Sequence, residues 1–172
     1  DHRVDQKATL NARLLDILIA DWDRHVDQWK FGVADTGKGK LYYPIPRDRD
    51  QAFYACDGLL IKYVSKSILP FFKGFREDIP KINWLGWSAR DFDRLFLNFL
   101  DWIEWETTIK EFQSTITDEV LQQSIAQLPK EVQPITGPGF IEKQKSRREL
   151  LMNRGRDYYD FISDQVNVLG SN

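Results

Sequence analysis

The sequences DRHVDQW, at residues 23–29, and PRDRDQAF, at residues 46–53, decide how this chain is expected to fold. Each is a short cluster of acidic and basic residues, and the residues between them have the pattern of one β-hairpin. A hairpin returns the chain to its starting point, so carboxylates on either side of it are expected to converge on a small volume. Sites that bind a metal ion and phosphate are commonly built in this way.

The hairpin is predicted by the alternation of its residues. Apolar residues alternate with Lys or Gly over residues 29–33, and alternation returns over residues 41–45, which is the spacing of half-buried strands. Residues 35–40, DTGKGK, supply the glycines and charges of a turn. Because Pro44 and Pro46 have no N–H group, we expect the second strand to be an edge strand or to leave the ladder early.

The two clusters resemble the catalytic and metal-binding loops of atypical kinases with the protein-kinase-like fold. These are the secretory-pathway protein kinases, the spore-coat protein kinases and the type II phosphatidylinositol 4-kinases. In that group an Asp-Arg pair opens the catalytic loop, a metal-binding side chain follows five positions later, and a second Asp stands five positions before a Phe. Asp23, Gln28 and Asp48 hold these places here, and Phe53 closes the second motif. The resemblance covers roughly the first third of the chain.

The resemblance implies that the catalytic loop is Asp23, Arg24 and His25. Asp23 would orient or deprotonate an acceptor hydroxyl. Phosphoryl transfer needs little more than such positioning, together with neutralisation of charge on the transferring oxygens.

The resemblance also implies that Asp48 and Asp50 bind the cofactor, Mg or Mn with ATP. Asp48 would hold a divalent cation that bridges the phosphates, and Asp50 would be a second metal contact or would position Arg24. Gln28 is the third implied metal ligand, although its neutral amide replaces the Asn or acidic residue of the family and is a weaker ligand for a hard cation. A metal-assisted phosphohydrolase site, which needs two metals, is therefore less favoured.

An alternative interpretation of the two clusters needs no ligand. Their acids would pair with their arginines as a rim of exposed ion pairs, each worth at most ~1 kcal/mol. The residues concerned are Asp23, Asp27, Asp48, Asp50, Arg24, Arg47 and Arg49.

The N-terminal lobe of a kinase is expected to be absent. Such a lobe covers the nucleotide with a glycine-rich loop and supplies a lysine from a strand. Only 22 residues precede Asp23, they are predicted to be helical, and no GxGxxG motif occurs. We therefore expect a mainly α fold with one β-hairpin, a kinase-C-lobe-like helical domain that binds ATP only if an upstream lobe is present.

The chain begins at Asp1 and not at Met, so we interpret residues 1–172 as a single domain that is a fragment of a larger multidomain protein. It also resembles the middle region of large bacterial cell-envelope proteins, in which a calcineurin-like metallophosphoesterase domain precedes it and an outer-membrane barrel follows. This resemblance implies an extracytoplasmic location and partners within the same polypeptide. It also implies an alternative function as a non-catalytic structural or docking module.

Composition limits the other function classes. A net charge of −2 argues against broad capture of nucleic acid, and no apolar run approaches the ~20 residues of a membrane helix. The single cysteine, Cys56, excludes an internal disulfide and a cysteine-based zinc site. It is either a nucleophile served by one of two histidines or, the favoured interpretation, a buried small thiol.

The remaining sequence predicts helices. Leu10, Leu14 and Ile17 give an amphipathic helix whose end delivers Asp21 and Asp23, where the helix dipole would raise their proton affinity unless a cation lies nearby. A second helix is predicted from 58 to 69, followed by an ordered aromatic loop to 87.

Further helices are predicted in the second half of the chain. One begins at Ser88 and continues past Ile103, with a solvated face of Asp93, Arg94, Asn98, Asp101 and Glu104. A short helix follows over residues 117–128, then a loop over 134–139 and a long helix over 140–166. The basic run within 143–148 is either a patch for phosphate or anionic lipid or, the favoured interpretation, the solvated face of that helix.

Overall fold

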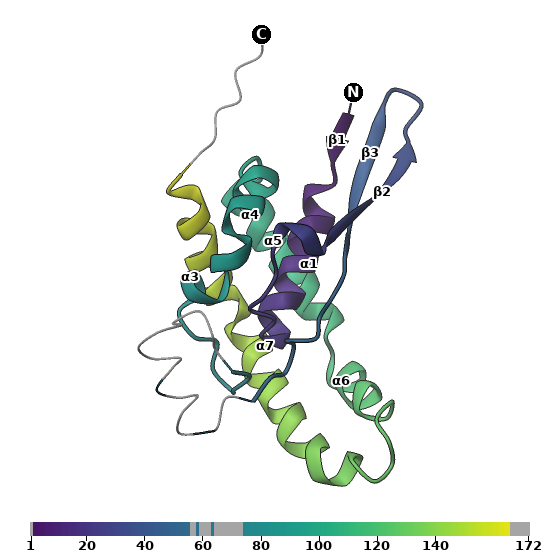
Figure 1. Cartoon of the computed structure of the whole chain (residues 1–172), viewed down its shortest axis with the longest axis vertical. Coiled ribbons are helices and arrows are strands. Elements are labelled where there is room, and N and C mark those ends of the chain that lie inside the picture. Colours follow the sequence, from purple (N-terminus) through teal and green to yellow (C-terminus); the bar gives the residue numbers. More distant parts are fainter. Residues whose placement is uncertain (1, 56–57, 59–62, 64–73, 166–172) are drawn as a thin grey trace.

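The computed structural model describes residues 2–55, 58, 63 and 74–165, without the side chain of Trp84 (Figure 1). The fold is mainly α, and a small three-stranded sheet lies to one side of the helices. In chain order the elements are β1 (His2–Val4), α1 (Gln6–Ile19), the 3-10 turn η1 (Val26–Gln28), β2 (Trp29–Asp35), β3 (Lys40–Pro46), α3 (Ile82–Leu85), η2 (Trp87–Ala89), α4 (Arg90–Leu97), α5 (Trp102–Thr115), α6 (Asp118–Ile125) and α7 (Gln133–Ser163).

The predicted hairpin is confirmed. Strands β2 and β3 are antiparallel, and their register runs from Trp29 opposite Pro46 to Asp35 opposite Lys40. Strand β1 pairs in parallel with the other side of β3, so the sheet order is β1-β3-β2. The expectation that β3 is an edge strand is therefore wrong, and so is a purely helical start of the chain.

The two prolines of β3 are tolerated because β1 is short. The carbonyl of Tyr42 accepts from the N–H of Asp5, so even-numbered residues of β3 turn their backbone groups toward β1 and away from β2. Strand β1 pairs only as far as Tyr42. The missing N–H groups of Pro44 and Pro46 therefore fall where β3 has a partner on one side only.

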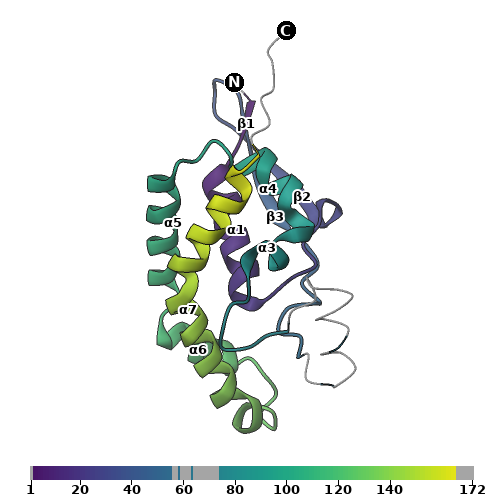
Figure 2. The ribbon, with the colours of Figure 1, turned by 90° about the vertical axis from the view of Figure 1, so that its left-hand side faces the viewer.

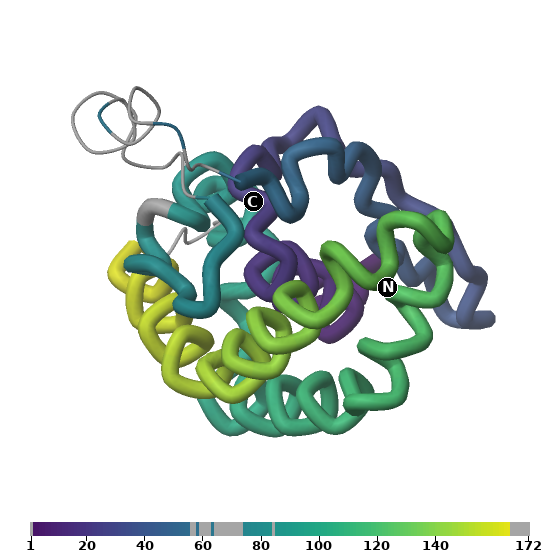
Figure 3. Tube along the Cα trace, turned by 90° about the horizontal axis from the view of Figure 1, so that it is seen from below, coloured from purple at the N-terminus to yellow at the C-terminus, as the bar shows by residue number. Residues whose placement is uncertain are grey.

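Helix α1 is the centre of the fold. In the view of Figure 3 its turns lie in the middle of the molecule, with α5 and α7 on one side and the hairpin on the other. Figure 2 shows α1 between α5 and the side that carries α3 and α4. The predicted apolar stripe of α1 is confirmed, since it belongs to a buried cluster with residues of the other helices: Leu10, Leu14, Ile17, Leu18, Ile79, Ile82, Leu85, Leu97, Trp105, Ile109, Leu151, Tyr158 and Ile162.

The single helix expected from Ser88 past Ile103 is wrong, because the structure divides it into α4 and α5. Helix α5 has its own N-terminal capping box, in which Asp101 accepts from the N–H of Glu104 and Glu104 accepts from the N–H of Asp101. Ser88 lies in η2 and does not cap α4. A local capping signal thus ends the continuous apolar pattern.

The break also changes which side chains are buried. Asp93 is fully buried and Arg94 nearly so, although both were expected on a solvated face. Phe99 and Ile103, which would lie on the apolar face opposite these residues if the helix were continuous, are 72% and 71% exposed. The pattern fails because residues on either side of the break no longer share one helical phase.

The loop expected over residues 134–139 is also wrong, because α7 begins at Gln133 and runs through it. Pro134 stands in the first turn, where its missing N–H has no helical acceptor. A Cβ on Gly137 would lie 2.9 Å from a methyl carbon of Ile125, so this glycine lets α7 approach α6 closely. Tertiary packing therefore outweighs the low helix propensity of Gly137, Pro138 and Gly139.

Other predictions have mixed outcomes. The short helix capped by Thr117 is confirmed as α6. The expected aromatic loop before residue 87 contains the short α3. Cys56 and most of the helix expected over 58–69 lie outside the described residues. No helix in the described ranges is both long and apolar enough to cross a membrane.

Arg147, from the basic run, is part of the interior and is neither a patch nor a solvated side chain. Its guanidinium donates to the carbonyls of Ile17 and Leu18, each at 2.6 Å, and so satisfies two of the last carbonyls of α1. It also donates to the carbonyls of Arg76 and Asp78, at 3.1 and 2.7 Å. Burial lowers the pKa of Arg147 to about 10. This side chain joins α7, the end of α1 and the segment before α3.

We expect Arg147→Met to lower the free energy of unfolding by about 3–5 kcal/mol, because four acceptors lose a charged donor. The matched variant Arg148→Met removes a partly exposed side chain that bonds Ile116 and Asp118, and should lower it by about 1 kcal/mol. Urea denaturation followed by circular dichroism measures both values. Equal losses in the two variants would contradict this role for Arg147.

Candidate functional site

The C-terminal end of α1 fixes the start of the first acidic cluster and the end of the second. Ala20 takes the left-handed conformation, with φ of 59°, and the N–H of Asp21 returns to the carbonyl of Asp16 at 2.9 Å. The N–H of Phe53 donates to the carbonyl of Ile19 at 2.9 Å. The end of the second cluster is therefore attached to the helix from which the first cluster emerges.

A buried carboxylate on α1, that of Asp16, receives three arginines. Its oxygens accept from Arg13 Nη1 at 2.8 Å, from Arg24 Nε and Nη2 at 2.9 and 3.1 Å, and from Arg49 Nε at 3.1 Å. Asp16 is fully buried and the side chain of Arg49 is 28% exposed. Arg24 belongs to the first cluster and Arg49 to the second, so a single carboxylate contacts both.

The same network extends into the helical core. Arg13 Nε lies 2.8 Å from Asp93 Oδ2 on α4, and the hydroxyl of Tyr158 on α7 donates to the same oxygen. Burial raises the pKa of the Asp93 carboxyl, an effect that the charge of Arg13 opposes. Burial also raises the pKa of Tyr158, so this hydroxyl stays protonated and acts as a donor. The network therefore connects three helices to both clusters.

Arg24 and Gln28 close the base of the hairpin. Arg24 Nη1 donates to the backbone carbonyl of Arg47 and to Gln28 Oε1, the latter at 3.2 Å. The N–H of Arg47 donates to the carbonyl of Gln28 at 2.8 Å, and the Arg24 guanidinium lies 5.4 Å from the ring centre of Trp29. The side chains of Arg24 and Gln28 are both buried, and the Gln28 oxygen that was predicted to bind metal accepts from Arg24.

The hairpin brings the predicted carboxylates within range of one another. Partial burial raises the pKa of the Asp23 carboxyl; His25 lowers it, and the charges of Asp50 and Asp48 raise it further. In the described ranges, none of these three acids forms an ion pair with a lysine or arginine. Asp48 also holds a left-handed backbone, with φ of 54°, which Asp tolerates better than most residues.

The alternative of a rim of exposed ion pairs is wrong in its pairings. Arg24 is 1% exposed and bonds Asp16 and Asp21, not the exposed acids, and Arg49 also turns inward to Asp16. The contact of His25 with Asp27, at 3.8 Å, is long. Arg24 and Arg49 therefore build the interior, whereas Arg47 is exposed, and Asp48 and Asp50 are left to solvent.

The fit of these residues to a metal ion is partial. Among the residues that the structure describes, no group of three or more His, Cys, Asp or Glu side chains is arranged to hold a metal. Magnesium in nucleotide sites is commonly held by one or two carboxylates, with phosphate oxygens and water completing its shell. Asp48 and Asp50 match that smaller requirement only when a nucleotide is bound as well.

Asp21 behaves as expected for an acid at this position, but for another main reason. Burial raises the pKa of its carboxyl from 3.8 to about 6, the neighbouring Asp16 adds to the rise, and Arg24 opposes it. Arg24 Nη2 lies 2.8 Å from the carboxylate. The cation expected to relieve the acids at the end of α1 is thus an arginine.

Phe53 anchors the second cluster through its ring. Its backbone is left-handed, with φ of 61°, which is rare for a bulky residue and is maintained by the surrounding contacts. The ring lies 5.1 Å from Phe75 and 4.8 Å from Phe140, measured between centroids. These aromatic contacts and the bond to Ile19 hold the place where the second cluster ends.

Sequence reasoning missed the charged residues of α1 and α4 that build this network. Arg13 lies three residues after Leu10, at a position of the apolar stripe, and Asp16 follows three residues later. A charge at a stripe position is a signal for a buried ion pair, because an unpaired charge there is too costly. Asp93 had no such signal, since its burial depends on the break between α4 and α5.

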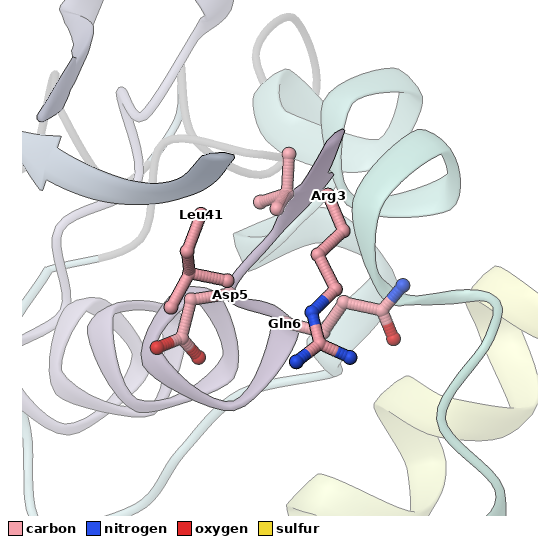
Figure 4. A pocket seen from close by; sticks show the side chains of 5 residues that line it. Arg3, Asp5, Gln6 and Leu41 are labelled. Carbon is pink, nitrogen blue, oxygen red and sulfur yellow. The ribbon is translucent and has the colours of Figure 1, made fainter. Parts of the chain in front are cut away.

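A pocket at the other end of α1 belongs to a different part of the molecule. Figure 4 shows the side chains of Arg3, Asp5, Gln6 and Leu41 around it, and its volume is about 390 Å³. The Asp5 carboxylate already accepts from the N–H of Ala8 at 2.9 Å and so caps the helix. Since α1 has 14 residues, this pocket lies roughly 20 Å from the acidic clusters.

Comparisons of the chain with protein-family models, with curated proteins and with solved structures gave no match.

The Asp21 carboxyl should make stability depend on pH. Its pKa is about 6 when folded against 3.8 unfolded, so its favourable contribution is complete below pH 3.8 and is lost as the pH rises through 6. In Asp21→Asn this dependence is absent. We expect the free energy of unfolding of the variant, relative to the wild type, to increase from about pH 4 to about pH 7 in urea denaturation. A difference that does not change with pH would contradict the raised pKa.

Proposed function

We propose that the chain is a kinase-like phosphotransfer half-site that a second, upstream lobe completes. The observation that carries this proposal is the group Asp23, Asp48 and Asp50. These carboxylates lie within electrostatic range of one another, and in the described part of the chain none of them forms an ion pair with a lysine or arginine, although the charges of His25 and Arg24 act on Asp23. Like charges held together in this way favour the binding of a cation.

The roles of these acids are those that the resemblance to atypical kinases implies. Asp23 would accept the proton of an acceptor hydroxyl or orient that hydroxyl, and its raised pKa suits it to proton transfer. Asp48 and Asp50 would hold Mg²⁺ or Mn²⁺ with the nucleotide phosphates. The bound cation would neutralise charge on the transferring phosphoryl group. Arg24 would position the catalytic loop from within the fold, because its donors are all engaged there.

The need for a second lobe rests on what these residues lack. Two or three carboxylates bind a divalent cation weakly until phosphate oxygens complete its shell. The described part of the chain has no GxGxxG motif, and no lysine of its strands forms an ion pair with these acids. An upstream domain of the same polypeptide would supply those groups, and ATP would bind between the two.

Binding of Mn·ATP by the polypeptide that includes its upstream domain tests this function. We expect isothermal titration calorimetry to detect manganese-dependent binding of ATP, and Asp48→Ala to weaken it at least about tenfold, or ~1.4 kcal/mol, through the lost ligand. The matched variant Asp164→Ala removes an exposed acid at the end of α7 and should leave the affinity unchanged. Absence of nucleotide binding in the wild type would contradict the catalytic proposal.

A non-catalytic docking module is the second candidate. It is favoured by the inward direction of the implied functional groups, since Arg24 is fully engaged with buried partners and Gln28 Oε1 accepts from Arg24. In this case the kinase-like hairpin and helices would serve as a scaffold between neighbouring domains of a cell-envelope protein. The exposed acids would then be ordinary surface charges.

The docking alternative makes the opposite prediction for the acids. Asp23→Ala and Asp48→Ala should leave the activity of the whole polypeptide within twofold of the wild type, because in a docking module neither carboxylate contacts a reacting group. An activity assay on the intact protein, with thermal unfolding to confirm that the variants are folded, measures this. A loss of activity in folded variants would favour the phosphotransfer function.

A further inference from the structure

We propose that Asp16 is the positioning residue of the candidate site: by binding Arg24 and Arg49 together it fixes the second acidic cluster against the first. The proposal rests on the proposed function, because Asp16 positions a phosphotransfer site only if the acids form one. The placement of the two loops can nevertheless be measured without any ligand. None of the motifs in the sequence included this residue.

The contact with Arg24 holds the first cluster. Two guanidinium nitrogens of Arg24 meet the two oxygens of Asp16, at 2.9 and 3.1 Å, which is a paired arrangement of fixed geometry. The third nitrogen reaches the carbonyl of Arg47. Because Asp23 adjoins Arg24 in the chain, fixing the guanidinium also fixes the backbone that carries Asp23.

The contact with Arg49 holds the second cluster. Arg49 stands between Asp48 and Asp50, and its Nε lies 3.1 Å from Asp16 Oδ1. The side chain of Arg49 is directed inward, whereas Asp48 and Asp50 on either side of it are exposed. The carbonyl of Arg49 also accepts from the N–H of Ala52 at 3.1 Å, which closes the turn that leads to Phe53.

The remaining contacts of Asp16 explain why it can serve as a fixed point. Arg13 also binds it, and Arg13 is held in turn by Asp93 on α4 and by Tyr158 on α7. A buried carboxylate with this many donors cannot change its rotamer without leaving charges unpaired. The positions of the two clusters are thus fixed relative to the helical core and not only relative to each other.

Arg49→Met separates positioning from general electrostatics. The matched control is Arg47→Met, which removes the same charge two residues earlier in the chain. The side chain of Arg47 is exposed and forms no ion pair in the described ranges. Removal of either positive charge should, through space alone, tighten the binding of a cation to the acids. If Arg49 positions the loop, Arg49→Met should instead weaken the binding of the cation, because the loop that carries Asp48 is released. Arg47→Met should not weaken it.

The first measurement is amide hydrogen exchange of this chain by NMR without metal. We expect the amides of Ala52 and Phe53 to exchange at least about tenfold faster in Arg49→Met, and amides of α5 to be unchanged. In Arg47→Met all of these rates should stay within twofold of the wild type. Exchange of Ala52 and Phe53 within twofold of the wild type in Arg49→Met would overturn the proposal.

The second measurement is Mn·ATP affinity of the polypeptide with its upstream domain. We expect Arg49→Met to weaken it at least about fivefold and Arg47→Met to leave it equal or tighter. Asp16→Asn should act like Arg49→Met, whereas Asp93→Asn, in the same buried network but without contact to either cluster, should only lower stability. Tighter binding in Arg49→Met would overturn the proposal.

The two measurements also separate this proposal from the proposed function. If the wild type binds no nucleotide but Arg49→Met releases the amides of Ala52 and Phe53, positioning stands and phosphotransfer fails. If nucleotide binds and Arg49→Met changes neither the exchange nor the affinity, phosphotransfer stands and positioning by Asp16 fails.

Discussion

The rest of the structure depends on how the buried carboxylate of Asp16 is paired. A carboxylate removed from water is strongly destabilising unless hydrogen bonds and opposite charges replace its hydration. Asp16 meets this requirement with Arg13, Arg24 and Arg49, from three separate segments of the chain. Helix α1 consequently carries a buried charged group beside its apolar stripe, and the loops that supply Arg24 and Arg49 pack against it.

This pairing separates the charges of the two clusters. Arg24 and Arg49 turn into the protein, while Asp48 and Asp50 are exposed and Asp23 is half-buried, and none of these acids forms an ion pair with a lysine or arginine in the described ranges. Such an arrangement concentrates negative charge on one small region without weakening the fold, because exposed charges are well solvated. The proposed cation site would therefore be an addition to a stable scaffold, and its occupancy is not needed to hold the loops in place.

The parts of this fold that the sequence predicts are those set by local rules. Alternation at residues 29–33 and the glycine-rich turn give the hairpin, and the apolar period gives α1. The break between α4 and α5 and the start of α7 were missed, since packing and a local cap outweighed the periodic pattern there. Motif spacing marks Asp23 and Asp48 as candidate site residues, and their roles stay predictions. Asp16 was not predictable, because its role arises only when distant arginines meet it.

The two candidate functions need the same structure in this chain and differ in which groups of the rest of the polypeptide face the acids. Both need the hairpin, the arginines directed inward and the anchored Phe53. A phosphotransfer site needs in addition a second set of ligands for the cation, because the described residues contain no group of three or more His, Cys, Asp or Glu side chains that could hold a metal. The chemistry is then decided by the surface that faces Asp23, Asp48 and Asp50 in the whole polypeptide. The buried network fixes that region in either case, and an opposing lobe that brings phosphate oxygens would convert a scaffold into a catalyst.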